Sequence, residues 1–272
     1  MKNLIVRTCS GILYIAIIVG AFCWGIKGVF LLSLLFCALA VSEFLNITTG
    51  TKLTQTSSWI DIIGALLLVC TFNLFVIWRL PLAGSLWLVW LIARMIYALY
   101  VTRQNSLKSV AASFMSQLYI ALPLGFLTLI YDTSAPLWIL MFILIWVNDT
   151  GAYLFGCTFG RHRLFERISP KKSWEGFAGG IVFATAFAIA AHFMLPEQFN
   201  MCGWIGWGIY GVIVSVFATF GDLFESLIKR TAGVKDSGNI MPGHGGLLDR
   251  IDSLLFVIIA TMLCFVFINT LI

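Results

Sequence analysis

Charged residues are scarce in this sequence. Asp, Glu, Lys and Arg make up 11% of the 272 residues, hydrophobic residues make up 60%, and the mean hydropathy is +0.98. An ordinary soluble domain carries about 25% charged residues. A chain of this size cannot hide so much apolar surface in one water-soluble core. The scarcity of charge therefore excludes an ordinary soluble protein and predicts an all-α, polytopic integral membrane protein.

Several familiar signatures are also missing. The seven cysteines include no CxxC pair and most lie in apolar stretches, so they are interpreted as small core residues, without a disulfide framework or a cysteine metal site. A GxxxxGK[ST] run is absent, which excludes a P-loop. The basic start precedes an apolar run without a clear cleavage site, so we expect a retained first helix. We see no internal repeat and no soluble domain.

Long apolar runs are what the sequence has in abundance. Because a helix needs about 20 apolar residues to cross the hydrocarbon layer, the sequence predicts about nine spans. The first two are separated by little more than residues 25–27, which predicts a tight helical hairpin. We expect one membrane domain over 1–272, with N-terminal helices in 1–134 and a second set of helices and loops in 135–272. The predicted spans are 8–25, 28–46, 59–78, 82–101, 113–131, 135–156, 174–195, 202–224 and 253–271.

The basic residues predict the orientation of these spans. With the N-terminus in the cytoplasm, fourteen Lys and Arg residues outside the spans face the cytoplasm and only Lys27 and Arg79 face outside. This positive-inside bias also explains the net charge of +5 without nucleic-acid binding. The two longest polar segments, near 156–173 and 229–252, then lie on the cytoplasmic side.

The eighth span ends in a polar face. Asp222, Glu225 and Lys229 follow helical spacing, and a carboxylate at the edge of hydrocarbon is costly unless it is paired or binds a cation. An interfacial Glu225–Lys229 pair accounts for those two residues without any function. It accounts less well for Asp222, which lies deeper.

Two further aspartates precede the ninth span. Asp249 and Asp252 are three residues apart, so they share a helical face near an N-terminus, where negative charge is favoured. One of them can be a simple helix cap. Together with Asp222 they can form a site for Mg²⁺, which binds through one or two carboxylates plus substrate phosphates. His244, Gly245 and Gly246 either offer backbone amides to an anion or form a plain turn.

The other polar segment carries a similar set. Asn148 and Asp149 end the sixth span, and Lys171, Lys172 and Ser173 precede the seventh. Lysines beside a helix N-terminus suit phosphate, although a basic loop also attracts anionic lipids. We prefer that second interpretation for the nearby arginines. The combined groups suit phosphoryl or nucleotidyl transfer, where positioning and charge neutralisation dominate, and the apolar surroundings indicate a lipid substrate.

These residues resemble a known family. The run Ser226-Leu227-Ile228-Lys229-Arg230, then Lys235-Asp236, then His244-Gly245-Gly246-Leu247-Leu248-Asp249-Arg250-Ile251-Asp252 is similar to the signature of CDP-diacylglycerol synthases, also called phosphatidate cytidylyltransferases. The segments 148–156 and 169–176 also resemble that family, as does Gly221-Asp222. The resemblance covers the chain from about residue 140 onward. Met241 departs conservatively from the family's usual residue.

The resemblance implies that CTP and phosphatidate give CDP-diacylglycerol and pyrophosphate. It implies Mg²⁺ and allows a second cation. It also implies a nine-helix homodimer and a location in the cytoplasmic (inner) membrane with the active site facing the cytoplasm. Asp222, Asp249 and Asp252 would be the cation ligands. Catalytic roles would fall to Asp222, Asp249, Lys229 and Arg250. Substrate contacts would come from Asn148, Asp149, Lys171, Lys172, Ser173, Arg230, Lys235, Asp236, His244, Gly245 and Gly246.

Two other functions fit the sequence less well. Another CTP-using membrane enzyme, such as a polyprenol kinase, would release CDP instead of pyrophosphate; a CDP-alcohol phosphotransferase is disfavoured because no DGxxAR-type run is present. A secondary transporter would carry its key polar groups near the bilayer midplane. Only Asp61, Asn73 and Arg94 are obvious candidates there, whereas the dense polar sets lie at the span ends.

Overall fold

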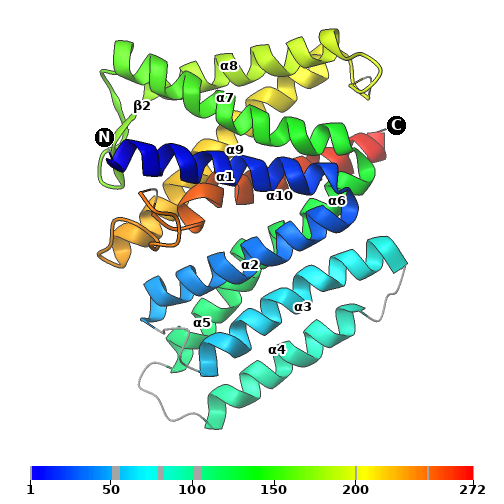
Figure 1. The fold of residues 1–272 in the computed structure, drawn as a ribbon, viewed down its shortest axis with the longest axis vertical. Coiled ribbons are helices and arrows are strands. Elements are labelled where there is room, and N and C mark those ends of the chain that lie inside the picture. The colour runs from blue at the N-terminus through cyan, green and yellow to red at the C-terminus, as the bar shows by residue number, and fades with distance from the viewer. Residues whose placement is uncertain are drawn as a thin grey trace. The chain divides into compact units, whose positions relative to one another are not determined.

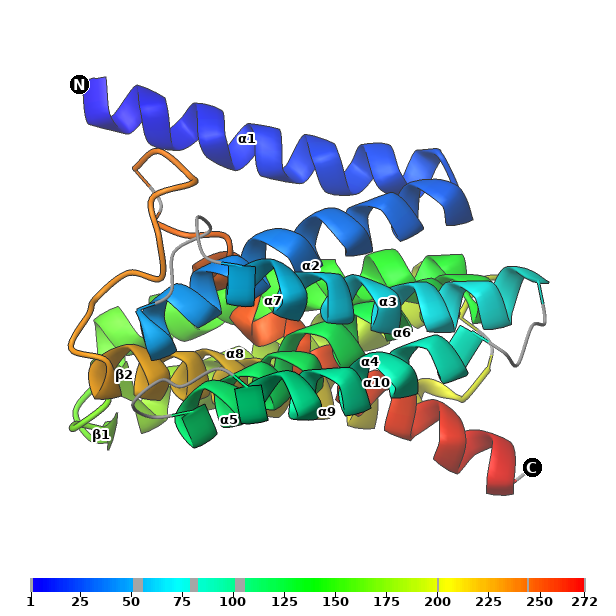
Figure 2. The ribbon, with the colours of Figure 1, turned by 90° about the horizontal axis from the view of Figure 1, so that it is seen from below.

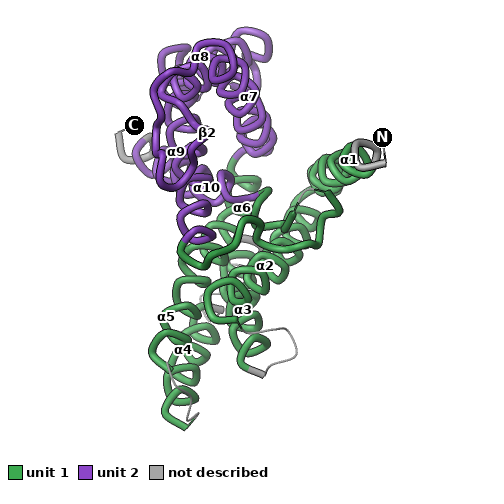
Figure 3. The backbone as a smooth tube through the Cα atoms, turned by 90° about the vertical axis from the view of Figure 1, so that its left-hand side faces the viewer, with its two compact units in different colours: residues 1–133, 231–250 green, residues 134–230, 251–272 purple. Residues whose placement is uncertain are grey.

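The computed structural model describes residues 2–50, 56–78, 83–100, 106–199, 201–243 and 245–271. Its described residues form two compact units (Figure 3). Unit 1 comprises residues 1–133 and 231–250, and unit 2 comprises residues 134–230 and 251–272. The described residues divide near residue 133, and the segment 231–250 belongs to the same compact unit as the helices of the first half. The single membrane domain expected from the sequence stays a prediction.

Unit 1 is a set of long helices (Figure 1). Gly25 adopts φ +80° between the first two helices, a conformation that glycine tolerates and that permits the predicted tight hairpin, which is visible in Figure 2. The helices of this unit are α1 (Lys2–Cys23), α2 (Ile26–Thr49), α3 (Thr56–Trp78), α4 (Ala83–Tyr100), α5 (Ser106–Ser116), the π-helical turn η1 (Gln117–Ala121) and α6 (Leu122–Thr133).

Unit 2 contains the remaining helices and a short ribbon. Its elements are α7 (Ala135–Phe159), the antiparallel strands β1 (Arg163–Phe165) and β2 (Ser169–Ser173), α8 (Trp174–Met194), α9 (Trp204–Thr231) and α10 (Leu248–Leu271). Glycines let α7 and α8 pack closely, because a Cβ at Gly176 would lie 2.9 Å from the carbonyl oxygen of Ala152. The sequence did not predict the ribbon, which leads directly into α8 (Figure 1).

The architecture confirms an all-α, polytopic membrane protein. Within the described ranges, eight helices are long and apolar enough to cross a membrane, and a shorter apolar stretch, Gly84–Tyr100, accounts for the fourth predicted span. The fifth span was predicted at 113–131, but the helical run covers Ser106–Thr133. It begins earlier because the polar residues at its start bind a neighbouring helix instead of ending the span. The orientation of the spans stays a prediction.

A π-helical turn interrupts that fifth run. Pro123 has no N–H and its ring crowds the carbonyl of residue 119, so a regular α-helix is disfavoured there. The turn widens instead, and Leu122 N–H bonds to the carbonyl of Gln117. Gln117 is thereby placed against α3, where its Nε2 donates to the carbonyl oxygen of Asp61 at 3.1 Å.

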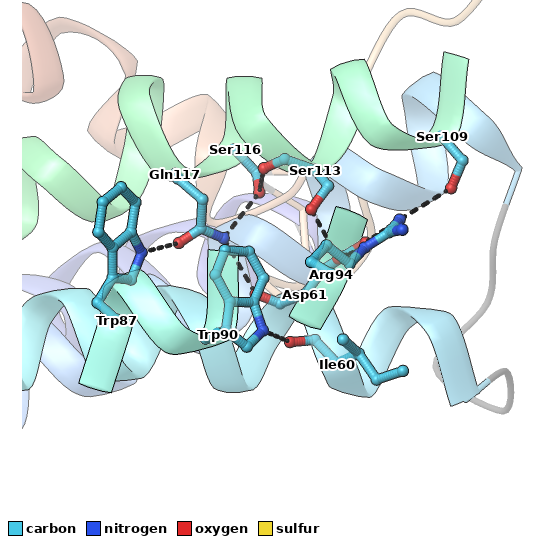
Figure 4. A network of polar contacts seen from close by, with 9 residues as sticks. All are labelled: Ile60, Asp61, Trp87, Trp90, Arg94, Ser109, Ser113, Ser116 and Gln117. Atoms are coloured by element: carbon cyan, nitrogen blue, oxygen red, sulfur yellow. Dashed lines mark hydrogen bonds and ion pairs between the residues drawn. The ribbon is translucent and has the colours of Figure 1, made fainter. Parts of the chain in front are cut away.

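A buried ion pair holds α3, α4 and α5 together (Figure 4). Arg94 Nε lies 2.6 Å from Asp61 Oδ1, and both side chains are almost wholly buried. Ser113 Oγ donates to the same carboxylate oxygen at 2.7 Å, and Arg94 Nη2 donates to Ser109 Oγ at 3.1 Å. Such satisfied hydrogen bonds are what a buried pair needs to repay the loss of its hydration. The network therefore fixes the packing of three helices.

Removing one partner of this pair should destabilise the protein. We expect Arg94→Met to lower the free energy of unfolding by about 3–5 kcal/mol, because Asp61 would then be a buried charge without its counter-ion. The double variant Asp61→Asn/Arg94→Met should recover part of that loss. Thermal unfolding in detergent measures both, with Lys108→Met, at an exposed position of α5, as the control. Equal midpoints for Arg94→Met and the control would contradict the assignment.

Candidate active site

Unit 2 contains a polar cavity of about 270 Å³. Its wall combines the second half of α7, the ribbon, the start of α8 and one turn of α9. Six residues predicted from the sequence to bind substrate or cation line it together, so the fold brings 148–149 and 171–173 to the same cavity as Asp222. Their roles in binding stay predictions. Those residues are Asn148, Asp149, Lys171, Lys172, Ser173 and Asp222.

Asn148 connects the helices around this cavity. It is buried within α7, and its Oδ1 accepts a hydrogen bond from Ser215 Oγ of α9 at 2.5 Å. Its Nδ2 donates to Asp149 Oδ1 at 3.2 Å. Asn148 also packs against α8, where a Cβ at Gly180 would overlap its side chain. Asn148 therefore sets the spacing of α7, α8 and α9, and it orients the neighbouring carboxylate.

An ion pair lies across the cavity. Lys172 Nζ is 2.7 Å from Asp222 Oδ2, and the two side chains are partly exposed, 26% and 40%. Lys172 Nζ also donates to the carbonyl oxygen of Thr219 at 3.4 Å, and Ser226 Oγ donates to Asp222 Oδ1 at 3.2 Å. Asp222 is thus held from two sides while part of it remains accessible to a ligand.

A second carboxyl group lies near Asp222 and interacts with it. Asp252 of α10 is buried, and electrostatic interactions couple it to Asp222, Lys172 and Asp149. Its Oδ1 accepts the N–H of Ser253 at 2.6 Å. Asp252 therefore interacts with two other carboxyl groups and with the ammonium group of Lys172. Carboxylate oxygens are the ligand type that a divalent cation such as Mg²⁺ takes in proteins.

This carboxylate set does not amount to a closed metal cage. Within the part of the chain that the structure describes, no three His, Cys, Asp or Glu side chains gather closely enough to hold a metal ion by themselves. Mg²⁺ is usually bound through one or two carboxylates plus water and substrate phosphates, so a cation here would need further ligands of that kind.

The start of α8 is held by two side chains. Ser173 caps the helix by accepting the N–H of Gly176 at 3.1 Å. Glu175, in the first turn, accepts the backbone N–H groups of Arg161 and His162 and pairs with His162 Nδ1 at 2.6 Å. These contacts tie the ribbon to the helix N-terminus and so direct Lys171 and Lys172 into the cavity, where the helix dipole adds to their positive charge.

The end of α9 contains the remaining predicted residues of unit 2. Lys229 pairs with the buried Glu225 four residues earlier, as the helical spacing predicted. Arg230 Nε donates to the carbonyl oxygen of Ile168 at 3.5 Å, which joins α9 to the turn of the ribbon. The pairing gives Lys229 a structural role, and its catalytic role stays a prediction.

The other predicted residues lie in the segment 235–250 of unit 1. Asp249 Oδ2 accepts two backbone N–H groups, from Ser237 and Gly246, each at 2.9 Å. Gly245 has φ +85°, a backbone conformation that other residues rarely adopt. A Cβ there would also lie 2.6 Å from Asp249 Oδ2, so both the backbone and the lack of space exclude a side chain at this position. Asp249 therefore closes the loop on itself. His244 lies outside the described residues, and Lys235, Asp236 and Arg250 are exposed.

The sequence analysis did not identify a buried carboxylate that binds the segment 235–250. Glu43 lies in the apolar helix α2 and is 5% exposed. Its two oxygens accept Leu247 N–H at 3.0 Å, Leu248 N–H at 2.8 Å and Ser237 Oγ–H at 3.0 Å. Glu43 thus caps the start of α10 from a site about 200 residues away in the chain. Its signal was available, because a lone ionisable residue within an apolar span is a candidate functional group by default.

A second missed feature is a polar stripe along α9. Ser215, Thr219, Asp222 and Ser226 recur at helical spacing, and Ser215 binds Asn148 while Thr219 and Asp222 line the cavity. The sequence showed this spacing, but only its acidic member was singled out.

Comparison with known proteins adds independent findings. The sequence model of the cytidylyltransferase family matches residues 5–268. A phosphatidate cytidylyltransferase from Staphylococcus aureus (strain COL) is 42% identical over 164 residues, which are 60% of this chain and 61% of that protein. The proteins of the same name from Staphylococcus saprophyticus and Staphylococcus epidermidis are 40% and 38% identical over the same shares of both chains. The similarity thus spans somewhat less than two thirds of these relatives.

The contacts of Glu43 predict how the segment 235–249 responds to mutation. In Glu43→Ala, the amides of Leu247 and Leu248 lose their acceptor, so we expect their hydrogen exchange to accelerate by about tenfold or more, the equivalent of one or two hydrogen bonds. Exchange measured by mass spectrometry on the full chain in detergent tests this. The matched control is Ser42→Ala, one residue away, whose hydroxyl donates only within α2 to Leu39. Unchanged exchange in Glu43→Ala would contradict the capping role.

Proposed function

The chain belongs to the cytidylyltransferase family, and from that premise we propose that it condenses CTP with phosphatidate to give CDP-diacylglycerol and pyrophosphate. One observation carries the proposal: the Lys172–Asp222 pair lies in a polar cavity at a helix N-terminus, next to a buried second carboxylate, in a chain otherwise composed of membrane-spanning helices. Cations for phosphate and carboxylates for a metal are the equipment of nucleotidyl transfer.

The proposed reaction is an in-line displacement. A phosphate oxygen of phosphatidate forms a bond to the α-phosphorus of CTP, and the bond from that phosphorus to the bridging oxygen breaks, so pyrophosphate leaves with the electron pair. A phosphate monoester has a second pKa of about 6, so the attacking oxygen is already largely deprotonated at neutral pH. A general base is therefore not required of the protein.

The residues of the cavity would position the two substrates. Lys171 and Lys172, at the N-terminal end of α8, would neutralise phosphate charge and hold the two anionic substrates together. Asn148 would keep Asp149 and the α9 stripe in place through its bonds to Asp149 and Ser215. From the resemblance alone, Lys235, Asp236, Gly245, Gly246 and Arg250 of the segment 235–250 are proposed as further contacts to the triphosphate.

Mg²⁺ is proposed as the cofactor. Asp222 and Asp252 of unit 2 would hold it, and when bound it would neutralise charge on the phosphates. Asp249 is proposed as a further ligand from the resemblance alone. A second cation is compatible with this number of carboxylates. By resemblance we also propose a homodimer in the cytoplasmic membrane with its cavity facing the cytoplasm.

The products of the reaction test the proposed function. Purified protein in mixed micelles should release pyrophosphate from CTP only when phosphatidate and Mg²⁺ are both present, and EDTA should stop the release. The lipid product should carry the cytidylyl group, identified by mass spectrometry. Formation of CDP together with a phosphorylated alcohol would instead identify a lipid kinase.

Charge-removing variants test the proposed cation ligands. We expect Asp222→Asn and Asp249→Ala to lower kcat by at least about 100-fold, because each removes charge stabilisation in the transition state. Asp249→Asn is the sharper variant, since an amide oxygen still accepts the N–H groups of Ser237 and Gly246 while the charge is lost. Thermal unfolding checks that each variant is folded.

The matched control for these variants is Asp132→Asn, an exposed aspartate at the end of α6 that should keep normal turnover. Near-normal activity in Asp249→Asn would remove Asp249 from the cation site and leave it the loop-closing role that its two amide contacts describe.

A further inference from the structure

Unit 2 has a second hollow, which is apolar, in contrast to the polar cavity. It measures about 460 Å³, and every residue that lines it is hydrophobic. Six of them follow one side of α9, from Val216 to Leu227, and the others come from the turn of the ribbon and from α10. The full lining is Phe165, Ile168, Val216, Phe217, Phe220, Leu223, Phe224, Leu227 and Phe256. We call this hollow the apolar groove.

The ribbon and α9 are walls of both spaces. Leu164 of β1 lines the polar cavity, whereas the next residue, Phe165, lines the groove. Ile168 lies in the groove, and the same ribbon continues to Lys171 and Lys172 in the cavity. A ligand bound at the edge of the ribbon would therefore have cations on one side and hydrocarbon on the other.

The same alternation occurs along α9. Thr219 and Asp222 line the polar cavity, while their immediate neighbours Phe220 and Leu223 line the groove. Successive residues of a helix point about 100° apart, so the two spaces occupy adjoining faces of one helical turn. Arg230 adds positive charge at the edge of the groove, because its Nε donates to the carbonyl oxygen of Ile168.

The position along α9 matches the boundary of the hydrocarbon layer. The helix has 28 residues and is therefore about 42 Å long, which exceeds the hydrocarbon thickness of about 30 Å. A helix of this length extends beyond the hydrocarbon or tilts within it, and the charged residues near the C-terminus of α9 identify the end nearer the headgroups. The groove follows this end of the helix, so a lipid bound in it would have its chain in the hydrocarbon and its glycerol toward the headgroups.

We infer that the apolar groove binds an acyl chain of the phosphatidate substrate while its phosphate lies in the polar cavity, with the ribbon 163–173 between them. The inference rests on the proposed function, and it assigns the site by the chemistry of an anionic amphiphile. Ordinary bilayer lipid can also cover an apolar face. It lacks the exposed phosphate monoester that Lys171 and Lys172 suit, so phosphatidate should be bound in preference.

Photolabelling tests the groove without requiring turnover. The full-length protein is reconstituted in phosphatidylcholine vesicles with a trace of phosphatidate that carries a diazirine in one acyl chain. After irradiation we expect mass spectrometry to find label on the peptides that contain 165–168 and 216–227. Excess phosphatidate should displace that label and excess phosphatidylcholine should not. Absence of label from these peptides, or equal displacement by both lipids, would overturn the inference.

A matched pair of tryptophan variants tests the same groove. Val216→Trp fills it, whereas Val212→Trp adds the same ring one turn earlier on α9, at an exposed position outside its lining. We expect Val216→Trp to reduce labelling and to raise the KM for long-chain phosphatidate by about tenfold, the loss of about two buried methylenes. The KM for CTP should stay within about twofold, as should turnover of a dibutyryl phosphatidate. Val212→Trp should resemble the wild type.

A third variant covers the case in which Val216→Trp does not fold. Phe165→Ala removes one wall of the groove from an exposed ribbon position, so its cost in stability is small, and it should raise the same KM. Identical KM values in the groove variants and Val212→Trp would overturn the inference. Absence of CTP turnover in the wild type would refute the proposed function instead, and the labelling result would still decide whether the groove binds an anionic lipid.

Discussion

An ionised side chain within an apolar helix needs a partner, and this requirement organises both units. Asp61 meets it through Arg94 and Ser113, Glu43 through two backbone amides and a serine, and Asp222 through Lys172. Burying a charge without such partners costs several kcal/mol. Each partner comes from a different helix, from a strand or from a loop, so satisfying the charge also fixes the packing. The few charged residues of this chain therefore determine much of its tertiary structure.

The two sets of partners have different consequences. In unit 1, Glu43 and Asp249 use their oxygens mainly to bind backbone N–H groups, which gives a loop rich in glycine one defined conformation. In unit 2, Asp252 is buried and interacts electrostatically with Asp222 and with Lys172, which is paired with Asp222. The first arrangement lowers the energy of the folded state. The second brings carboxyl groups together beside a cavity, an arrangement that is more frequent at functional sites.

The sequence predicted what depends on composition and on local spacing. Apolar runs of sufficient length gave the helices, and the Glu225–Lys229 spacing gave an ion pair that the structure contains. Contacts between distant segments could not be predicted from composition or local spacing. Glu43 accepts a hydrogen bond from Leu248, some 200 residues later in the chain. Ser215 donates to Asn148 only because α7, α8 and α9 pack together. The ribbon was missed because two strands of three and five residues carry almost no periodic signal.

The buried polar residues of the first half of the chain argue against the transporter alternative. A substrate pathway needs polar groups that a solute can reach near the bilayer midplane. Asp61 instead lies in the second turn of α3, buried and bonded to Arg94 and Ser113, while Asn73 donates to the carbonyl of Val69 in its own helix. Asp61 and Arg94 are satisfied by each other and by serines, so they have little interaction energy left for a solute and act as connections between helices. Asn73 Oδ1 is buried without a hydrogen-bond partner among the described residues, so it is closed to a solute by burial. The accessible charges of unit 2 are concentrated where α7, the ribbon, α8 and α9 meet.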